Sequence, residues 1–164
     1  MQEPEARRDP ALKRILLQAL VGDVRLVLQG VGRPTDAEVD QHVYEALGMA
    51  GSVRAVLVVT EGREAAGPDA RQRQKLARAG LLRIPTAVVT ESMLARGVMT
   101  AVSWLGGPIK GFAPDHLSTA LDFLKVSTPV RARIPAQLEA LRAELHGKPP
   151  VRSSAPPAVH QPRR

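Results

Sequence analysis

The sequence predicts one α/β domain: a mixed sheet of four to five strands with crossover helices, followed by a C-terminal helix and a disordered Pro/Arg-rich tail. Apolar, valine-rich segments alternate with amphipathic helical patterns, and this alternation is typical of α/β folds. A length of 164 residues with 44% hydrophobic residues is enough to bury one core. We divide the chain into a flexible arm (1–12), the domain (13–126), a linker with a C-terminal helix (127–147) and the tail (148–164).

A hairpin is predicted at the start of the domain. Two apolar runs, Arg14–Leu20 and Val24–Gly30, flank the Gly22-Asp23 pair, which is typical of a tight turn. An alternative stays open for the first run, because some of its apolar residues also follow helical spacing: Ile15, Leu16, Ala19 and Leu20.

Two strand–helix units are expected next. Thr35 and Glu38 have capping-box spacing, which predicts a helix that continues to Gly48. The β-branched run Val53–Thr60 is apolar on both faces, as a central strand would be. A helix over Ala70–Ala79 and a buried strand over Ile84–Val89 follow.

The third crossover helix is expected to begin at Thr90 or Ser92. Small residues between Ala95 and Ala101 would let this helix approach a sheet closely. Its predicted apolar stripe consists of Leu94, Val98, Ala101, Val102 and Leu105. The remaining elements are a short edge strand at Ile109–Phe112, a helix from Pro114 to Leu124 and a helix from Pro135 to His146.

Composition and charge exclude several classes of protein. The absence of cysteine excludes disulfides, thiolate zinc sites and cysteine nucleophiles. Aromatic residues make up only 2% of the chain, which argues against base-stacking nucleic-acid modules. Of the net charge of +7, +4 lies between Lys148 and Arg164, and the remainder is scattered over the chain. We find no membrane-spanning run and no secretory signal, and expect a cytoplasmic protein.

The sequence contains no recognisable catalytic, metal-binding or cofactor-binding motif. The four histidines are far apart and none lies in a metal-ligand pattern. Gly30-Val31-Gly32 lacks the third glycine of a dinucleotide fingerprint, and there is no phosphate-binding loop or nucleophile elbow. We therefore expect no enzyme activity, no metal and no cofactor.

Two polar groups are candidate binding sites for a partner or ligand. Thr90, Glu91 and Ser92 at a helix start, together with Arg96, could hold an anion or an acidic side chain. The alternative is a plain helix cap with Arg96 pairing with Glu91. The second group is basic and could meet an acidic protein, a phospholipid surface or RNA, although a solvated helix face is the favoured interpretation: Arg71, Arg73, Lys75, Arg78 and Arg83.

The stretch Ala87–Leu105 carries a family resemblance. It reads Ala-Val-Val-Thr-Glu-Ser-Met-Leu-Ala-Arg-Gly-Val-Met-Thr-Ala-Val-Ser-Trp-Leu. This resembles the signature of the bacterial SpoIIAA-like STAS and CRAL-TRIO-like family, in which a Val-Thr-Asp-Ser-x-Leu-x-Arg-Gly run precedes an Ala-rich helix ending in Trp-Leu. Phe112 and Ser118–Leu124 resemble the family's closing strand and helix. The resemblance covers about residues 13–126 and implies a STAS-like domain.

The resemblance also implies a class of function. Better-known relatives bind a regulatory kinase or hold a lipid or small ligand. Anti-anti-sigma factors carry a phosphorylatable serine where the second crossover helix begins, but here Ala65–Ala70 contains no hydroxyl at that place. The resemblance therefore implies no serine switch in this chain.

Our leading hypothesis is a non-enzymatic, STAS-like regulatory or scaffolding module that acts through a protein partner. The alternative is a small-molecule or lipid carrier with a pocket between the sheet and its helices. Nucleic-acid binding through Arg71, Arg73 and Arg78 is a weaker third hypothesis. Homo-oligomerisation stays open, and so does the tail's role as a partner-recruiting segment or a plain linker.

Overall fold

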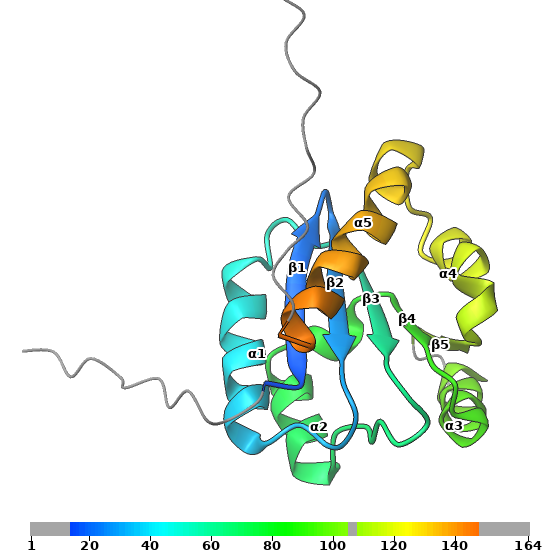
Figure 1. Cartoon of the computed structure of the whole chain (residues 1–164). Helices are drawn as coiled ribbons and strands as arrows, with labels where there is room; N and C mark the ends of the chain where they lie inside the picture. Colours follow the sequence, from blue (N-terminus) through cyan, green and yellow to red (C-terminus); the bar gives the residue numbers. More distant parts are fainter. Residues whose placement is uncertain (1–13, 105–107, 148–164) are drawn as a thin grey trace, which may run out of the picture.

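The computed structural model describes residues 14–104 and 108–147, without the side chains of residues 102–104 (Figure 1). The predicted arm and the predicted Pro/Arg-rich tail lie outside the described residues. The strands are β1 (Leu16–Val21), β2 (Val24–Gln29), β3 (Ala55–Thr60), β4 (Thr86–Val89) and β5 (Ile109–Phe112). The helices are α1 (Asp36–Gly48), α2 (Ala70–Arg78), α3 (Met93–Trp104), α4 (Leu117–Phe123) and α5 (Thr128–Leu145), with short 3₁₀ turns η1 (Leu81–Arg83) and η2 (Pro114–His116).

The strands form one mixed sheet in the order β1-β2-β3-β4-β5, which confirms the predicted fold class. β1 and β2 are antiparallel, and β2, β3, β4 and β5 run parallel to one another. In the part of the chain described, no helix is long and apolar enough to cross a membrane.

The predicted hairpin is confirmed, and the helical alternative for its first run is wrong. Val21 pairs with Val24 across the turn, where Gly22 has a left-handed φ of +64°. A Cβ atom at Gly22 would lie 2.5 Å from Cγ2 of Val130. Glycine is therefore required at this turn both by the backbone and by the close approach of α5.

Helices α1 and α2 begin at capping boxes. The Glu38 N–H donates to Thr35 Oγ1 at 3.2 Å, and the Thr35 N–H donates back to Glu38 Oε2 at 2.9 Å. Asp69 and Gln72 form the same reciprocal pair at the start of α2. These bonds satisfy backbone donors that a helix end otherwise leaves free, so the caps place the helix starts.

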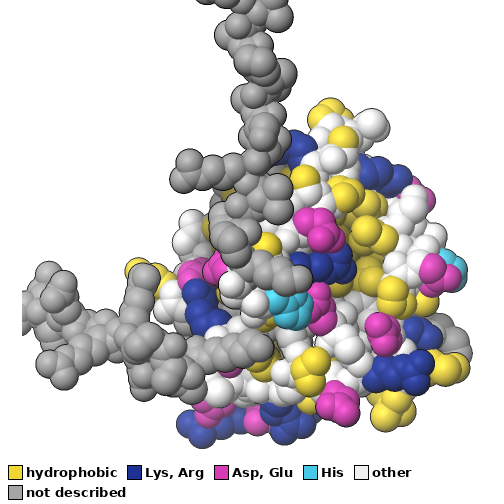
Figure 2. Space-filling view, viewed as in Figure 1, with side chains coloured by type: hydrophobic (Ala, Val, Ile, Leu, Met, Phe, Trp, Pro, Cys, Tyr) yellow, Lys and Arg dark blue, Asp and Glu magenta, His cyan; other side chains and the backbone are white. Residues whose placement is uncertain are grey.

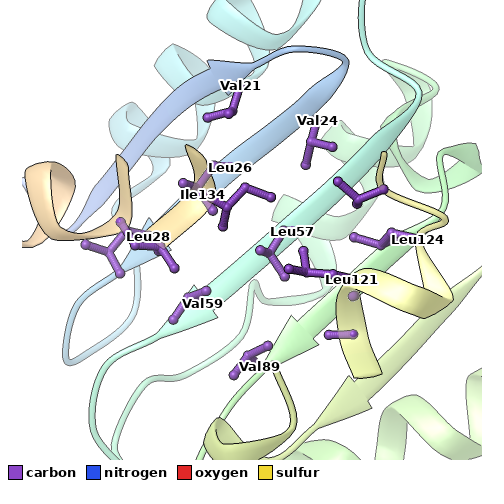
Figure 3. Close-up of a cluster of buried hydrophobic side chains, with 14 of the residues drawn as sticks. Val21, Val24, Leu26, Leu28, Leu57, Val59, Val89, Leu121, Leu124 and Ile134 are labelled. Carbon is purple, nitrogen blue, oxygen red and sulfur yellow. The ribbon is translucent and has the colours of Figure 1, made fainter. Parts of the chain in front are cut away.

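Helices α4 and α5 cover one face of the sheet, which we call the front face. Figure 1 shows α5 lying across β1 and β2, with α4 beside β4 and β5. Figure 3 shows Ile134 of α5 pointing toward Leu26 and Leu57 of the central strands. All three side chains are fully buried. The front face therefore holds the main apolar core.

The start predicted for the last helix is wrong. α5 begins at Thr128 rather than Pro135, so most of the predicted linker after residue 126 is helical. Pro129 lies in the first turn, where the missing N–H is not needed. Pro135 lies inside the helix, where proline is normally disfavoured. Burial of Ile134 and Leu138 against the sheet outweighs that penalty.

Helices α1, α2 and α3 lie on the opposite face, which we call the back face. The Gln18 amide of β1 reaches the His42 carbonyl of α1 on this side, and Gly111 of β5 meets α3. Besides Val27 and Val56, the back face buries polar side chains, including Arg25 and Gln29 at 4% and 6% exposure. The two faces of the sheet thus differ in chemistry.

Candidate functional site

A cleft of about 540 Å³ opens where strands β3 and β4 end. Parallel strands of an α/β sheet commonly place ligand sites at their carboxyl ends. Figure 2 shows hydrophobic side chains gathered between α5 and α4, with acidic side chains near them. The cleft is lined by Val59, Thr60, Glu61, Gly62, Val89, Glu91, Pro114, Leu117, Pro135, Ala136, Leu138, Glu139 and Arg142.

One wall of the cleft is held by an ion-pair network centred on Glu61. Arg142 Nε donates to Glu61 Oε1 at 3.0 Å, and Arg142 Nη1 donates to Glu139 Oε1 at 2.6 Å. His146 Nε2 lies 2.8 Å from Glu61 Oε2. The Glu61 side chain is only 20% exposed, so both carboxylate oxygens have partners where water is scarce.

Sequence reasoning missed this network. Glu61 and Arg142 lie 81 positions apart, in a loop and in a late helix. The only local signal is that Arg142 and His146 are four residues apart and so share a helix face. The pattern does not say which acid those two cations meet.

The predicted cluster at Thr90 lies beside the cleft and is bonded mainly to itself. Thr90 is 2% exposed, and its Oγ1 accepts the Ser92 N–H at 3.2 Å. Ser92 Oγ accepts the Ala95 N–H at 3.2 Å, so the predicted cap on α3 is confirmed. Arg96 Nη1 donates to the Thr90 carbonyl at 2.7 Å.

The predicted pairing of Arg96 with Glu91 is wrong. Glu91 Oε2 lies 3.8 Å from Arg63 Nε instead, and Glu91 lines the cleft. The buried carbonyl of Thr90 takes the Arg96 guanidinium because that oxygen would otherwise lack a strong donor at the strand end. Anion binding at this cluster stays a prediction.

The basic group on α2 is partly neutralised by acids that α1 supplies. Arg71 Nη1 lies 3.7 Å from Asp36 Oδ2, and Lys75 Nζ lies 2.6 Å from Asp40 Oδ1. Arg73 donates to the Pro68 carbonyl at 3.0 Å. Arg78 and Arg83 are exposed. These pairings favour the solvated helix face over a concentrated positive surface, because the nearby carboxylates reduce the local charge.

The predicted apolar stripe of α3 is exposed to solvent. Leu94 and Val98 are 81% and 57% exposed, and the adjacent Met93 is 79% exposed. Ala101 is exposed as well, whereas the side chains of Val102 and Leu105 lie outside the described residues.

Gly111 determines which side of α3 packs against β5. A Cβ atom there would lie 3.0 Å from Arg96 Cα and 3.0 Å from Met99 Cε. The strand therefore supplies the small residue that allows close packing, and α3 packs through Arg96 and Met99. Gly97, which the sequence placed among the residues for close approach, is exposed. The opposite arc of α3, with Leu94 and Val98, consequently faces outward.

No three His, Asp or Glu side chains among the described residues are grouped so that they could hold a metal ion.

Comparisons with protein-family models, with curated proteins and with solved structures find no match to this chain. The resemblance to the SpoIIAA-like STAS family therefore stays a prediction.

Proposed function

We propose that this chain is a non-enzymatic, STAS-like regulatory or scaffolding module that binds a protein partner through the α3 arc, which we define as Met93, Leu94, Gly97, Val98 and Ala101. The single observation that carries this proposal is the exposure of three large apolar side chains on one arc of one helix: Met93, Leu94 and Val98. Contiguous exposed apolar surface of this kind marks interaction sites.

The composition of the α3 arc favours a protein partner with an apolar surface. The arc contains no charged side chain. Burying one large apolar side chain is worth about 1.5–3 kcal/mol, so a few such contacts can drive specific association. Nucleic-acid binding has less support, because Arg71 and Lys75 on α2 already face Asp36 and Asp40.

Site-specific photo-crosslinking tests the proposal. A photoreactive residue at position 94 should crosslink to one discrete protein in cells that express the chain, and the same residue at the exposed position 74 of α2 should not. Val98→Asp should abolish that crosslink, whereas the matched charge change Gln74→Glu should leave it intact. Equal crosslinking from both positions, or a product that Val98→Asp leaves unchanged, would refute the proposed surface.

A second candidate function, a carrier of a small molecule or lipid, is favoured by the cleft between the sheet and helices α4 and α5. Its place differs from the one expected, because the crossover helix α3 does not line it. Native mass spectrometry of freshly purified protein tests the carrier function. A co-purified ligand, lost in Ala136→Trp, supports a carrier, and a clean apo mass from the native host argues against one.

A further inference from the structure

We infer that the cleft binds a small organic cation, an amine or a guanidine carried on an apolar body. This inference rests on the second candidate function, small-molecule binding, and assigns it a ligand class. Three features of the cleft carry it: its size, its apolar floor and the sign of the charge around it.

The size and floor of the cleft suit one small apolar body. A volume of about 540 Å³ lies in the range typical of sites for single small ligands. Val59 and Val89, from neighbouring parallel strands, form an apolar floor and are 5% and 4% exposed. Leu117 of α4 and Leu138 of α5 line the cleft from two sides. A ligand body in the cleft would therefore exchange water for hydrocarbon on several sides.

The charges around the cleft determine which sign of charge a ligand should carry. Among the residues that the structure describes, three carboxylates line the cleft, from Glu61, Glu91 and Glu139, against the single cation Arg142, which gives a net charge of −2. Arg142 already donates to Glu61 and Glu139, so it is engaged by the cleft's own acids. Adding Arg63, whose side chain is 87% exposed and whose Nε lies 3.8 Å from Glu91 Oε2, still leaves −1 when the His146 imidazole beside Glu61 is neutral. This excess repels fatty acids and phosphates and attracts an ammonium or guanidinium group.

Three probes with the same phenylbutyl body and different head groups separate the effect of ligand charge on affinity from the effect of ligand shape. Phenylbutylamine, phenylbutanol and phenylbutyrate would be titrated into the full chain, with affinity measured by calorimetry and location by methyl NMR shifts. We expect the amine to bind about tenfold more tightly than the alcohol and the carboxylate to bind weakest, because only the amine meets the excess of carboxylates. The shifted methyl signals should be those of Val59, Val89, Leu117 and Leu138.

Variants locate the effect. The double change Glu91→Gln and Glu139→Gln should lower amine affinity about tenfold and leave alcohol affinity unchanged. Glu144→Gln, an exposed charge change on α5 outside the cleft, is the matched control. Ala136→Trp should block all three probes, since Ala136 lines the cleft. Circular dichroism would verify that each variant is folded.

Each outcome supports or overturns a defined part of the inference. Equal binding of amine and alcohol would overturn the cation preference while leaving small-molecule binding in place. Tighter binding of the carboxylate would overturn the charge argument itself. No saturable binding of any probe would refute both the inference and the second candidate function. Binding that Ala136→Trp leaves unchanged would place the ligand elsewhere and overturn the assigned cleft.

Discussion

The front and back faces of the sheet bury different kinds of side chain. On the front, side chains from β1 to β5 meet α4 and α5 in one apolar cluster that includes Leu26, Leu57 and Ile134, each 0% exposed. On the back, Arg25 and Gln29 are buried at 4% and 6% exposure beneath the helices. Apolar burial is the main favourable term in folding, so we expect the front face to supply most of the stability.

Unpaired polar atoms are concentrated on the back face. Gln18 Oε1, Arg25 Nε and His42 Nδ1 are buried in the described part of the chain without hydrogen-bond partners. Burial lowers the pKa of Arg25, and burial together with the nearby Arg25 charge lowers the pKa of His42 to about 4. The two faces of this sheet therefore contribute differently to the free energy of unfolding. The front face contributes apolar burial, and the contribution of the back face depends on pH.

The largest expected effect is on the front face. Ile134→Ala should lower the free energy of unfolding by about 4 kcal/mol, because it deletes buried methyl groups and leaves a cavity between α5 and the sheet. Urea denaturation measures this loss. The control is Leu82→Ala in η1, where the side chain is 47% exposed and the change should stay below about 0.5 kcal/mol. A similar loss in both variants would contradict the burial of Ile134 between α5 and the sheet.

An intermediate effect is expected from pH on the back face. The folded-state pKa of His42, about 4, lies below its ordinary value of 6.5, so between these values the unfolded chain binds a proton that the folded chain excludes. Stability should therefore be complete above about pH 7 and fall by about 3 kcal/mol as the pH drops toward 4.

Paired variants separate His42 from the carboxylates that titrate in the same range. Unfolding free energies measured between pH 7 and 4 should decline less in His42→Gln than in the parent chain. The exposed His116→Gln serves as the control and should leave the decline unchanged. Parallel pH profiles for the parent and His42→Gln would show that His42 is accessible to protons in the folded state.

The smallest effect on stability is expected at the α3 arc. Leu94→Ala should change the free energy of unfolding by less than about 0.5 kcal/mol, because Leu94 is 81% exposed and loses few contacts. Thermal and urea unfolding would measure it. A loss above about 1 kcal/mol would show that Leu94 is covered within the folded chain, and the proposed docking surface would then be wrong.

Among the candidate sites, local signals identified some residues and missed others. Glu91 was predicted as a site residue from its place at a helix start, and it lines the cleft. No local signal marks Glu139 or Arg142, because the pattern from Pro135 to His146 predicts only a helix with one apolar stripe. Their role depends on how α5 lies across the sheet, which no short-range pattern encodes.

The sequence by itself determined the elements whose signals are local. Gly22 at a tight turn, the Thr35 and Glu38 capping box and the valine-rich run of β3 each act over a few residues, and each is found as predicted. Hydrogen bonds and steric limits between near neighbours are sufficient to specify these features.

Only the tertiary structure decided how these elements meet. Gly111 admits the Arg96 and Met99 side of α3, which turns Leu94 and Val98 to solvent, although the helical pattern of α3 alone indicated an ordinary apolar stripe. Burial of Ile134 extends α5 across Pro135 and so places Glu139 and Arg142 at the cleft. The orientation of a helix depends on the shape of the surface that receives it, and that surface forms from residues distant in the chain.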